Sequence, residues 1–164
     1  MIATVLAWLL SMGATCFTPP VDAPVVDPFR APACTYCAGN RGIEYGTQPG
    51  QAVVAAASGT VTYSGAVAGV RYVVVRHGDG RLATYGRLES TVAVVGGLLQ
   101  QGGLVGAASD RFYFGLRDQG IYIDPAPWLG SWRGRPRLIP SDGSHARPSP
   151  PRRMICGAST PPGR

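Results

Sequence analysis

The sequence predicts an all-β domain, an antiparallel sandwich or barrel of short strands joined by glycine-rich turns. Its 164 residues include 23 glycines and 15 prolines, a composition that favours tight turns between short elements. Valine-rich apolar runs are only a few residues long, and turn residues separate them. No stretch shows the apolar spacing of a long amphipathic helix. A chain of this length suffices for one domain with a modest hydrophobic core.

The first predicted strands follow an extended, proline-containing entry segment. Two short apolar runs meet at Ser58 and Gly59, which read as a turn. A hairpin follows, because Asp79 and Gly80 form a strong turn signal between two valine- and leucine-containing runs. These four predicted strands are residues 52–56, 59–64, 72–76 and 82–85.

The second half of the pattern completes a set of about seven short strands. Residues 90–109 contain a strand, a Gly-Gly turn and another short apolar run. A last hairpin is predicted from residues 111–116 and 121–123, which flank the turn that ends at Gly120. Frequent turns between strands of this length are typical of sandwiches and barrels.

The positive charge lies in the C-terminal segment. Every basic side chain is Arg, and residues 22–130 contain eight Arg and eight acidic residues. Residues 131–164 contain seven Arg and one acidic residue, which accounts for the net charge of +6. This segment is also rich in Pro, Gly and Ser, so we predict a disordered basic tail over 131–164. It either attaches to an anionic wall polymer or lipid head groups, or is simply solvated. No stacking platform for nucleic acid accompanies the charge.

The N-terminus has the character of an export signal. Residues 2–12 are almost wholly apolar and small residues follow, as in a secretory signal peptide. The run is too short to span a bilayer comfortably, and a buried N-terminal element is the alternative. We therefore expect a secreted, extracytoplasmic protein, divided into a signal peptide and linker at 1–23, a β domain at 24–130 and the tail.

Export permits disulfides, and the chain has four cysteines. Cys34 and Cys37 form a Cys-x-x-Cys, for which a local disulfide is favoured. A zinc knuckle would need a second close pair, and a thioredoxin-type redox pair would need a βαβ context. Cys16 is open to two interpretations, since it could be acylated after signal cleavage or could bond to Cys156.

Four segments in order resemble the lysostaphin-type, LytM-like zinc endopeptidases, the M-23 metallopeptidases. The segments are GNRGIEYGTQPGQAVVAAASGTVTYSG from residue 39, VVVRHGDGRLATYGRL from residue 73, RFYFGLR from residue 111 and IYIDPAPWL from residue 121. Members of this family cut peptide crosslinks in bacterial peptidoglycan. The resemblance covers residues 28–129 and implies a LytM-type β core, similar to a duplicated hybrid motif.

The resemblance fails at the residues that carry the chemistry. It implies zinc ligands at Asn40, Glu44 and Tyr113, where the family has His, Asp and His. It implies catalytic histidines at the positions of Arg87 and Arg111. Of these residues, only Glu44 ligates a metal well, because an amide and a neutral phenol are poor zinc ligands. We therefore expect no catalytic residues here, and a former zinc groove that serves for binding.

The physical requirements of zinc chemistry lead to the same expectation. A hydrolytic zinc site needs about three protein ligands of the imidazole or carboxylate type and an open position for water. The chain has two histidines, His77 before the predicted hairpin turn and His145 in the tail. His77 is most simply a hairpin residue that is hydrogen-bonded to backbone. We expect no bound metal, no other cofactor and no metal-dependent hydrolysis.

The replacements themselves suggest a specific arrangement. We hypothesise that Glu44 pairs with Arg87 or Arg111, so that guanidinium charge takes the place of zinc. Remaining Arg donors could then bind a carboxylate, such as one on a peptide stem. The alternative is structural repair of a dead site without any ligand.

These observations favour an exported, catalytically degenerate domain that acts as a peptidoglycan-binding or regulatory module at the cell wall. Its partner would be a stem peptide or a wall hydrolase, since degenerate members of this family include activators of peptidoglycan amidases. Two alternatives remain open. One is an active peptidoglycan metalloendopeptidase with non-standard ligands, and the other is an extracytoplasmic thiol–disulfide protein that uses Cys34 and Cys37.

Overall fold

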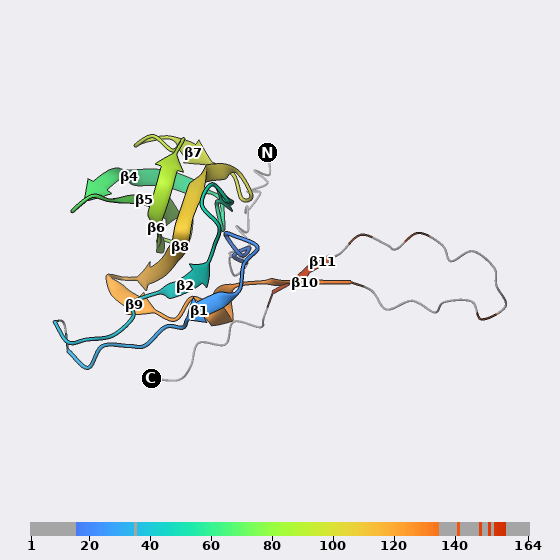
Figure 1. Ribbon diagram of the computed structural model, residues 1–164, viewed down its shortest axis with the longest axis horizontal. Helices are drawn as coiled ribbons and strands as arrows, with labels where there is room; N and C mark the ends of the chain where they lie inside the picture. Colours follow the sequence, from blue (N-terminus) through green and yellow to red (C-terminus); the bar gives the residue numbers. More distant parts are fainter. Residues whose placement is uncertain are drawn as a thin grey trace, which may run out of the picture.

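The computed structural model describes residues 16–34, 36–134, 141, 148, 151 and 153–156. The predicted signal peptide therefore lies outside the described residues, as does most of the predicted tail. Within the described residues, nine strands form one antiparallel sheet with the order β1-β2-β8-β6-β5-β4-β7, and β3 and β9 also pair with β8 (Figure 1). The prediction of an all-β, antiparallel fold is confirmed.

The strands vary in length, and β8 is the longest of those described. Their bounds are β1 Val25–Asp27, β2 Ile43–Gly46, β3 Ala52–Val54, β4 Gly59–Val67, β5 Val70–His77, β6 Leu82–Thr91, β7 Leu98–Leu99, β8 Leu104–Asp118, β9 Ile121–Ile123, β10 Ser131–Arg133 and β11 Arg153–Ile155. A three-residue 3₁₀ helix, η1, spans Ala126–Trp128. In the described part of the chain, no helix is long and apolar enough to cross a membrane.

The two predicted hairpins are present, whereas the first two predicted strands do not pair with each other. The turn between β5 and β6 contains Gly80 with φ of 85°, a conformation that glycine adopts without strain. The turn between β8 and β9 ends at Gly120, as predicted. β3 pairs with β8 and β4 pairs with β5, because residues 55–57 are buried and lead the chain across the core between them.

The core is formed by one face of the central strands. Phe112, Phe114 and Leu116 alternate along β8 and are fully buried. Tyr85 of β6 is also fully buried, and its hydroxyl oxygen accepts a hydrogen bond of 2.8 Å from the Ala56 N–H. The remaining residues of β8 near its middle point to the opposite face, where the candidate site lies.

The folded domain includes residues 16–23, which the sequence analysis assigns to the linker. Phe17 is fully buried, and its ring meets the ring of His77 edge-on with centroids 5.0 Å apart. The backbone N–H of Phe17 donates to Trp128 O at 3.2 Å, and Gly130 N donates to Phe17 O at 2.7 Å. Sequence pattern alone missed this segment because its partners are distant in the sequence.

The expectation of a disordered tail does not hold for residues 131–133 and 153–155, which pair as β10 and β11. A disulfide between Cys16 and Cys156 joins the start of the described chain to the end of β11. This crosslink reduces the entropy cost of ordering a proline- and arginine-rich segment. A second disulfide links Cys34 and Cys37, as the sequence predicts.

Candidate functional site

Strand register brings the predicted groove residues to one face of the sheet. Glu44 of β2 lies opposite Tyr113 of β8, and Tyr113 lies opposite Gly86 of β6. Arg87 follows Gly86, and Arg111 precedes Tyr113 by two residues and so shares its face. Four of the five side chains selected from the sequence therefore converge from three neighbouring strands, and the fifth, that of Asn40, comes from the segment before β2.

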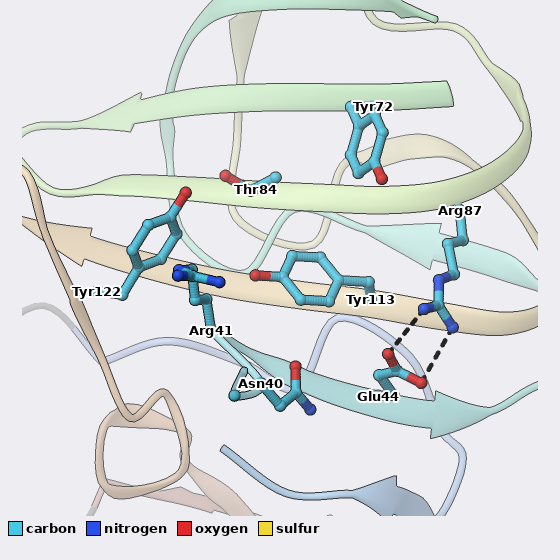
Figure 2. A pocket seen from close by; sticks show the side chains of 9 residues that line it. Asn40, Arg41, Glu44, Tyr72, Thr84, Arg87, Tyr113 and Tyr122 are labelled. Carbon is cyan, nitrogen blue, oxygen red and sulfur yellow. Dashed lines mark hydrogen bonds and ion pairs between the residues drawn. The ribbon is translucent and has the colours of Figure 1, made fainter. Parts of the chain in front are cut away.

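These strands form one wall of an open groove of about 390 Å³. Figure 2 shows the side chains that line it: Asn40, Arg41, Glu44, Tyr72, Thr84, Arg87, Tyr113 and Tyr122, together with Gly39. Sequence reasoning missed Arg41, Tyr72, Thr84 and Tyr122. The sequence could have indicated Tyr72 and Thr84, because both lie on predicted strands next to apolar residues of the core face and therefore point to the opposite face. Tyr122 reaches the groove through the β8–β9 turn.

The groove contains an ion pair in which one carboxylate, that of Glu44, meets two guanidinium groups. Arg87 Nη1 donates to Glu44 Oε2 at 3.0 Å, and Arg87 Nη2 lies 2.9 Å from Glu44 Oε1, so the pair is bidentate (Figure 2). Arg111 Nε lies 3.3 Å from Glu44 Oε2. The Glu44 side chain is 9% exposed. The hypothesised pairing is confirmed, and it involves both arginines rather than one.

A β-bulge directs Arg87 toward Glu44. The pairing of β6 with β5 shifts register at this point, because Gly86 and Leu88 pair with the adjacent residues Tyr72 and Arg71 and leave Arg87 as the extra residue. Arg87 has φ of 57°, a left-handed conformation that costs a residue with a Cβ about 1–2 kcal/mol. The hydroxyl of Ser109 donates to the Arg87 carbonyl oxygen at 2.8 Å and fixes the bulge. A strained backbone held in this way is typical of functional sites.

Asn40 has a structural role at the edge of the groove. Its Nδ2 group donates to the carbonyl oxygens of Pro28 at 3.1 Å and Asp27 at 3.3 Å. Its backbone exchanges two hydrogen bonds with Arg30. These contacts hold the segment before β2 against the segment after β1. The side-chain nitrogen is thus engaged in holding the loop.

The Tyr113 ring rests on a floor of glycines. A Cβ on Gly42, Gly86 or Gly115 would come within 2.7, 3.1 and 2.6 Å of side-chain atoms of Tyr113. Burial raises the pKa of the Tyr113 phenol far above its ordinary value, with a further contribution from Tyr122. The phenol is therefore neutral at physiological pH and is a weak ligand for a metal ion.

The residues at these positions do not fit a zinc ion. The Asn40 nitrogen is engaged by backbone carbonyls, Tyr113 is a neutral phenol, and the Glu44 carboxylate is already neutralised by two cations. Two guanidinium groups beside the carboxylate would also repel a dication. Within the residues that the structure describes, no three His, Cys, Asp or Glu side chains cluster as metal ligands.

The other candidates lie outside the groove. His77 is buried on the core side, where its Nδ1 is 2.9 Å from the Ser58 carbonyl oxygen, as predicted for a hairpin residue bonded to backbone. Burial lowers the pKa of His77. Cys34 and Cys37 lie in the loop that leads to Gly39 and Asn40 at the groove rim. His145 lies outside the described residues.

The sequence matches a known protein family and several curated bacterial proteins. The profile of Peptidase family M23 matches residues 38–125. The murein hydrolase activator EnvC of Escherichia coli is 35% identical over 98 residues, which cover 55% of this chain and 23% of EnvC. The murein hydrolase activator NlpD of Salmonella typhimurium is 30% identical over 118 residues, 67% of this chain and 30% of NlpD. The chain thus spans about a quarter to a third of these relatives.

Solved structures with the same fold are also found. A structure of Helicobacter pylori Csd3 superimposes with a TM-score of 0.64 at 18% identity, over 71% of this chain and 33% of Csd3. At this identity the similarity shows the fold alone. The all-β architecture that the four sequence segments predict is therefore shared with a solved protein.

Proposed function

Since the chain belongs to Peptidase family M23 and carries an ion-pair cluster where the zinc ligands are expected, we propose that it is a catalytically degenerate, non-hydrolytic module. It acts outside the cytoplasm, binds the cell wall and regulates a wall hydrolase. The resident zinc of the family has been lost, and no other cofactor replaces it. The groove residues Asn40, Glu44, Arg87, Arg111 and Tyr113 form the binding site rather than a catalytic centre.

The observation that carries this proposal is the engagement of the Glu44 carboxylate by two arginines. One negative and two positive charges leave the cluster with a net positive charge. Arg111 contacts Glu44 through Nε, and half of its side chain is exposed, so its terminal amino groups are placed to meet a ligand. A planar guanidinium binds a carboxylate in two-pronged fashion. The ligand chemistry that fits is a carboxylate, such as one on a peptide stem.

The names of similar proteins support a regulatory role. Two bacterial relatives are called murein hydrolase activators, and an activator needs no hydrolytic centre of its own. This chain covers only part of the length of those proteins, and we propose that it shares their regulatory activity. Location outside the cytoplasm rests on the apolar segment at residues 2–12, and a role of the tail in binding anionic wall polymers rests on its seven arginines.

Digestion of dye-labelled peptidoglycan sacculi tests this function. The purified chain alone should release no dye with or without added zinc, and should increase the release caused by a purified wall hydrolase. Arg111→Gln should weaken sacculus binding or hydrolase activation about tenfold, since it removes a charge-assisted contact. The matched control is Arg76→Gln, an exposed arginine on β5 that lies outside the groove.

Two results of this assay would contradict the proposed function. Zinc-dependent release of dye by the chain alone, abolished in Glu44→Ala, would show an active metalloendopeptidase and contradict the proposal. A chain that neither binds sacculi nor changes the rate of any wall hydrolase would contradict it as well.

A further inference from the structure

A loop beside the groove projects from the body of the domain. Residues 31–34 and 36–39, which we call the disulfide arm, lie between β1 and β2 and extend away from the sheet at one end of the molecule (Figure 1). Mutual backbone hydrogen bonds between Arg30 and Asn40, of 2.9 and 3.0 Å, close the arm at its base. Arg30 also pairs with Asp27. The arm is therefore anchored where it leaves the domain.

The arm is braced at its tip as well. Cys34 and Cys37 form a disulfide, and the Cys37 N–H donates to the Cys34 carbonyl oxygen at 3.1 Å. Near the base, a Cβ on Gly39 would come within 2.8 Å of the Arg30 carbonyl oxygen, so the two sides of the arm are in close contact. A short loop with a covalent link at its tip and paired backbone at its base has little conformational freedom to lose on binding.

Tyr36 lies between the two cysteines and is 96% exposed. Among the described residues, the other tyrosines that count as exposed, Tyr63 and Tyr122, are only 38% and 37% exposed. A single exposed apolar residue is ordinary on a protein surface. Here, however, the exposed ring is presented by a doubly braced loop whose base, Gly39 and Asn40, forms the rim of the groove. The position of Tyr36 near the groove and the bracing of the arm together indicate a surface that contacts a partner.

The chemistry of the arm and the groove defines the kind of partner. The segment APACTYCAG at 31–39 contains no charged residue. The adjoining groove is positively charged, with Arg41 and Arg87 on its lining and Arg111 beside Glu44. A matching surface has an uncharged, apolar pocket for one aromatic ring and carboxylates next to it. Such a combination belongs to a folded protein rather than to a glycan strand or a lipid head group.

We propose that the disulfide arm is the docking element for the wall hydrolase that this chain regulates, with Tyr36 inserted into an apolar pocket of that protein. This inference rests on the proposed function and adds a second contact outside the groove. Tyrosine is among the residues that dominate binding energy, because a large ring is buried at the cost of only two side-chain torsions. The disulfide serves the contact by holding the ring in its presented position.

Binding of the full chain to purified wall hydrolases, measured by titration calorimetry together with dye release from sacculi, tests the arm. Tyr36→Ala should weaken binding of the activated hydrolase about 30-fold and reduce activation in parallel. Tyr36→Phe should bind within about threefold of the wild type, because the ring remains. Cys34→Ser/Cys37→Ser should weaken binding less than Tyr36→Ala. The control Tyr63→Ala, on β4, should leave binding unchanged.

The outcomes separate the arm from the groove. Unchanged hydrolase binding by Tyr36→Ala, with a clear loss in Arg111→Gln, would overturn the arm while keeping the proposed function. Loss of sacculus pelleting in Tyr36→Ala with full hydrolase binding would assign the ring to the wall polymer and also overturn the arm. If no hydrolase binds the wild-type chain, both proposals fail. The melting temperature of Tyr36→Ala should equal that of the wild type, since the ring is exposed.

Discussion

The two faces of β8 differ in what they retain of a peptidase. On the core face, Phe112, Phe114 and Leu116 are fully buried and pack as the fold requires. On the groove face, Arg111 and Tyr113 stand where the family resemblance implies histidines, and Arg111 places positive charge beside Glu44. Adjacent residues of one strand thus follow separate constraints, because successive side chains point to opposite faces.

This difference shows that fold and chemistry are separable in this architecture. Packing of the core face fixes the register of β2, β8 and β6. This register brings together the side chains on the other face, whatever their chemistry. Glu44 and its two arginines occupy the converging positions without disturbing the packing behind them. Under the proposed function, the chain lacks hydrolysis and uses the same groove for binding.

Substitution of neighbouring residues on opposite faces should give the largest contrast. Phe114→Ala removes a fully buried ring that meets Tyr85 at a centroid distance of 5.4 Å. The free energy of unfolding should fall by about 3–5 kcal/mol, as is usual for loss of a buried aromatic ring. Tyr113→Phe, one position earlier, should change it by less than about 1 kcal/mol. Urea denaturation of both variants measures the contrast, and equal losses would contradict the division of faces.

Removal of the groove carboxylate should have the next largest effect. Glu44→Ala leaves Arg87 and Arg111 without their counter-charge on the sheet surface. Because these arginines are 39% and 50% exposed, solvent screens them, and the expected loss is about 1–3 kcal/mol rather than the value for a fully buried pair. Chemical denaturation at low and high salt gives the measurement. A gain in stability would show that the carboxylate is retained only for function.

The core face also contains a group that titrates. Burial lowers the pKa of His77, so the unfolded chain binds a proton at higher pH than the folded chain does. The contribution of His77 to the free energy of unfolding is fully present above its pKa in the unfolded chain, about 6.5. It is lost as pH falls toward the lower pKa of the folded chain. The change in the free energy of unfolding caused by this one group should not exceed about 1.4 kcal/mol per pH unit. Urea denaturation at pH values between about 7 and about 5 should show that the free energy of unfolding depends less on pH in His77→Gln than in the wild type. An equal pH dependence in both proteins would contradict the role given to His77.

The smallest predicted effect concerns the bulge that presents Arg87. Arg87→Ala removes the ion pair and keeps a Cβ at φ of 57°, whereas Arg87→Gly removes both the pair and the strain. The glycine variant should therefore be about 1 kcal/mol more stable than the alanine variant, although both lose the contact with Glu44. Thermal unfolding of the two variants in parallel checks the difference. If alanine is the more stable of the two, the backbone at this position is not strained.

Much of the site was predictable because it depends on local motifs. The segments around Asn40, Arg87 and Arg111 lie on or next to strands of recognisable pattern, and the resemblance aligned them with one groove. Opposite charges in a shared groove then made pairing of Glu44 with arginine the natural expectation. The Cys34–Cys37 disulfide was predictable from its short spacing.

What the sequence did not reveal depends on contacts between distant residues. Burial of Phe17 requires the segment near Trp128 and the ring of His77, and no local pattern announces either partner. The β10–β11 ribbon, whose composition alone is that of a solvated tail, is likewise linked through the Cys16–Cys156 disulfide to a residue 140 positions away. Long-range pairing is set by the whole fold rather than by a segment.

Zinc stoichiometry tests the central claim most directly. The full chain would be incubated with zinc, desalted and measured by elemental mass spectrometry, with Glu44→Ala treated in the same way. Because the carboxylate is held by Arg87 and Arg111, both proteins should retain far less than one equivalent of zinc. Retention of one equivalent by the wild type, lost in Glu44→Ala, would show that the groove still holds a metal and would contradict this account.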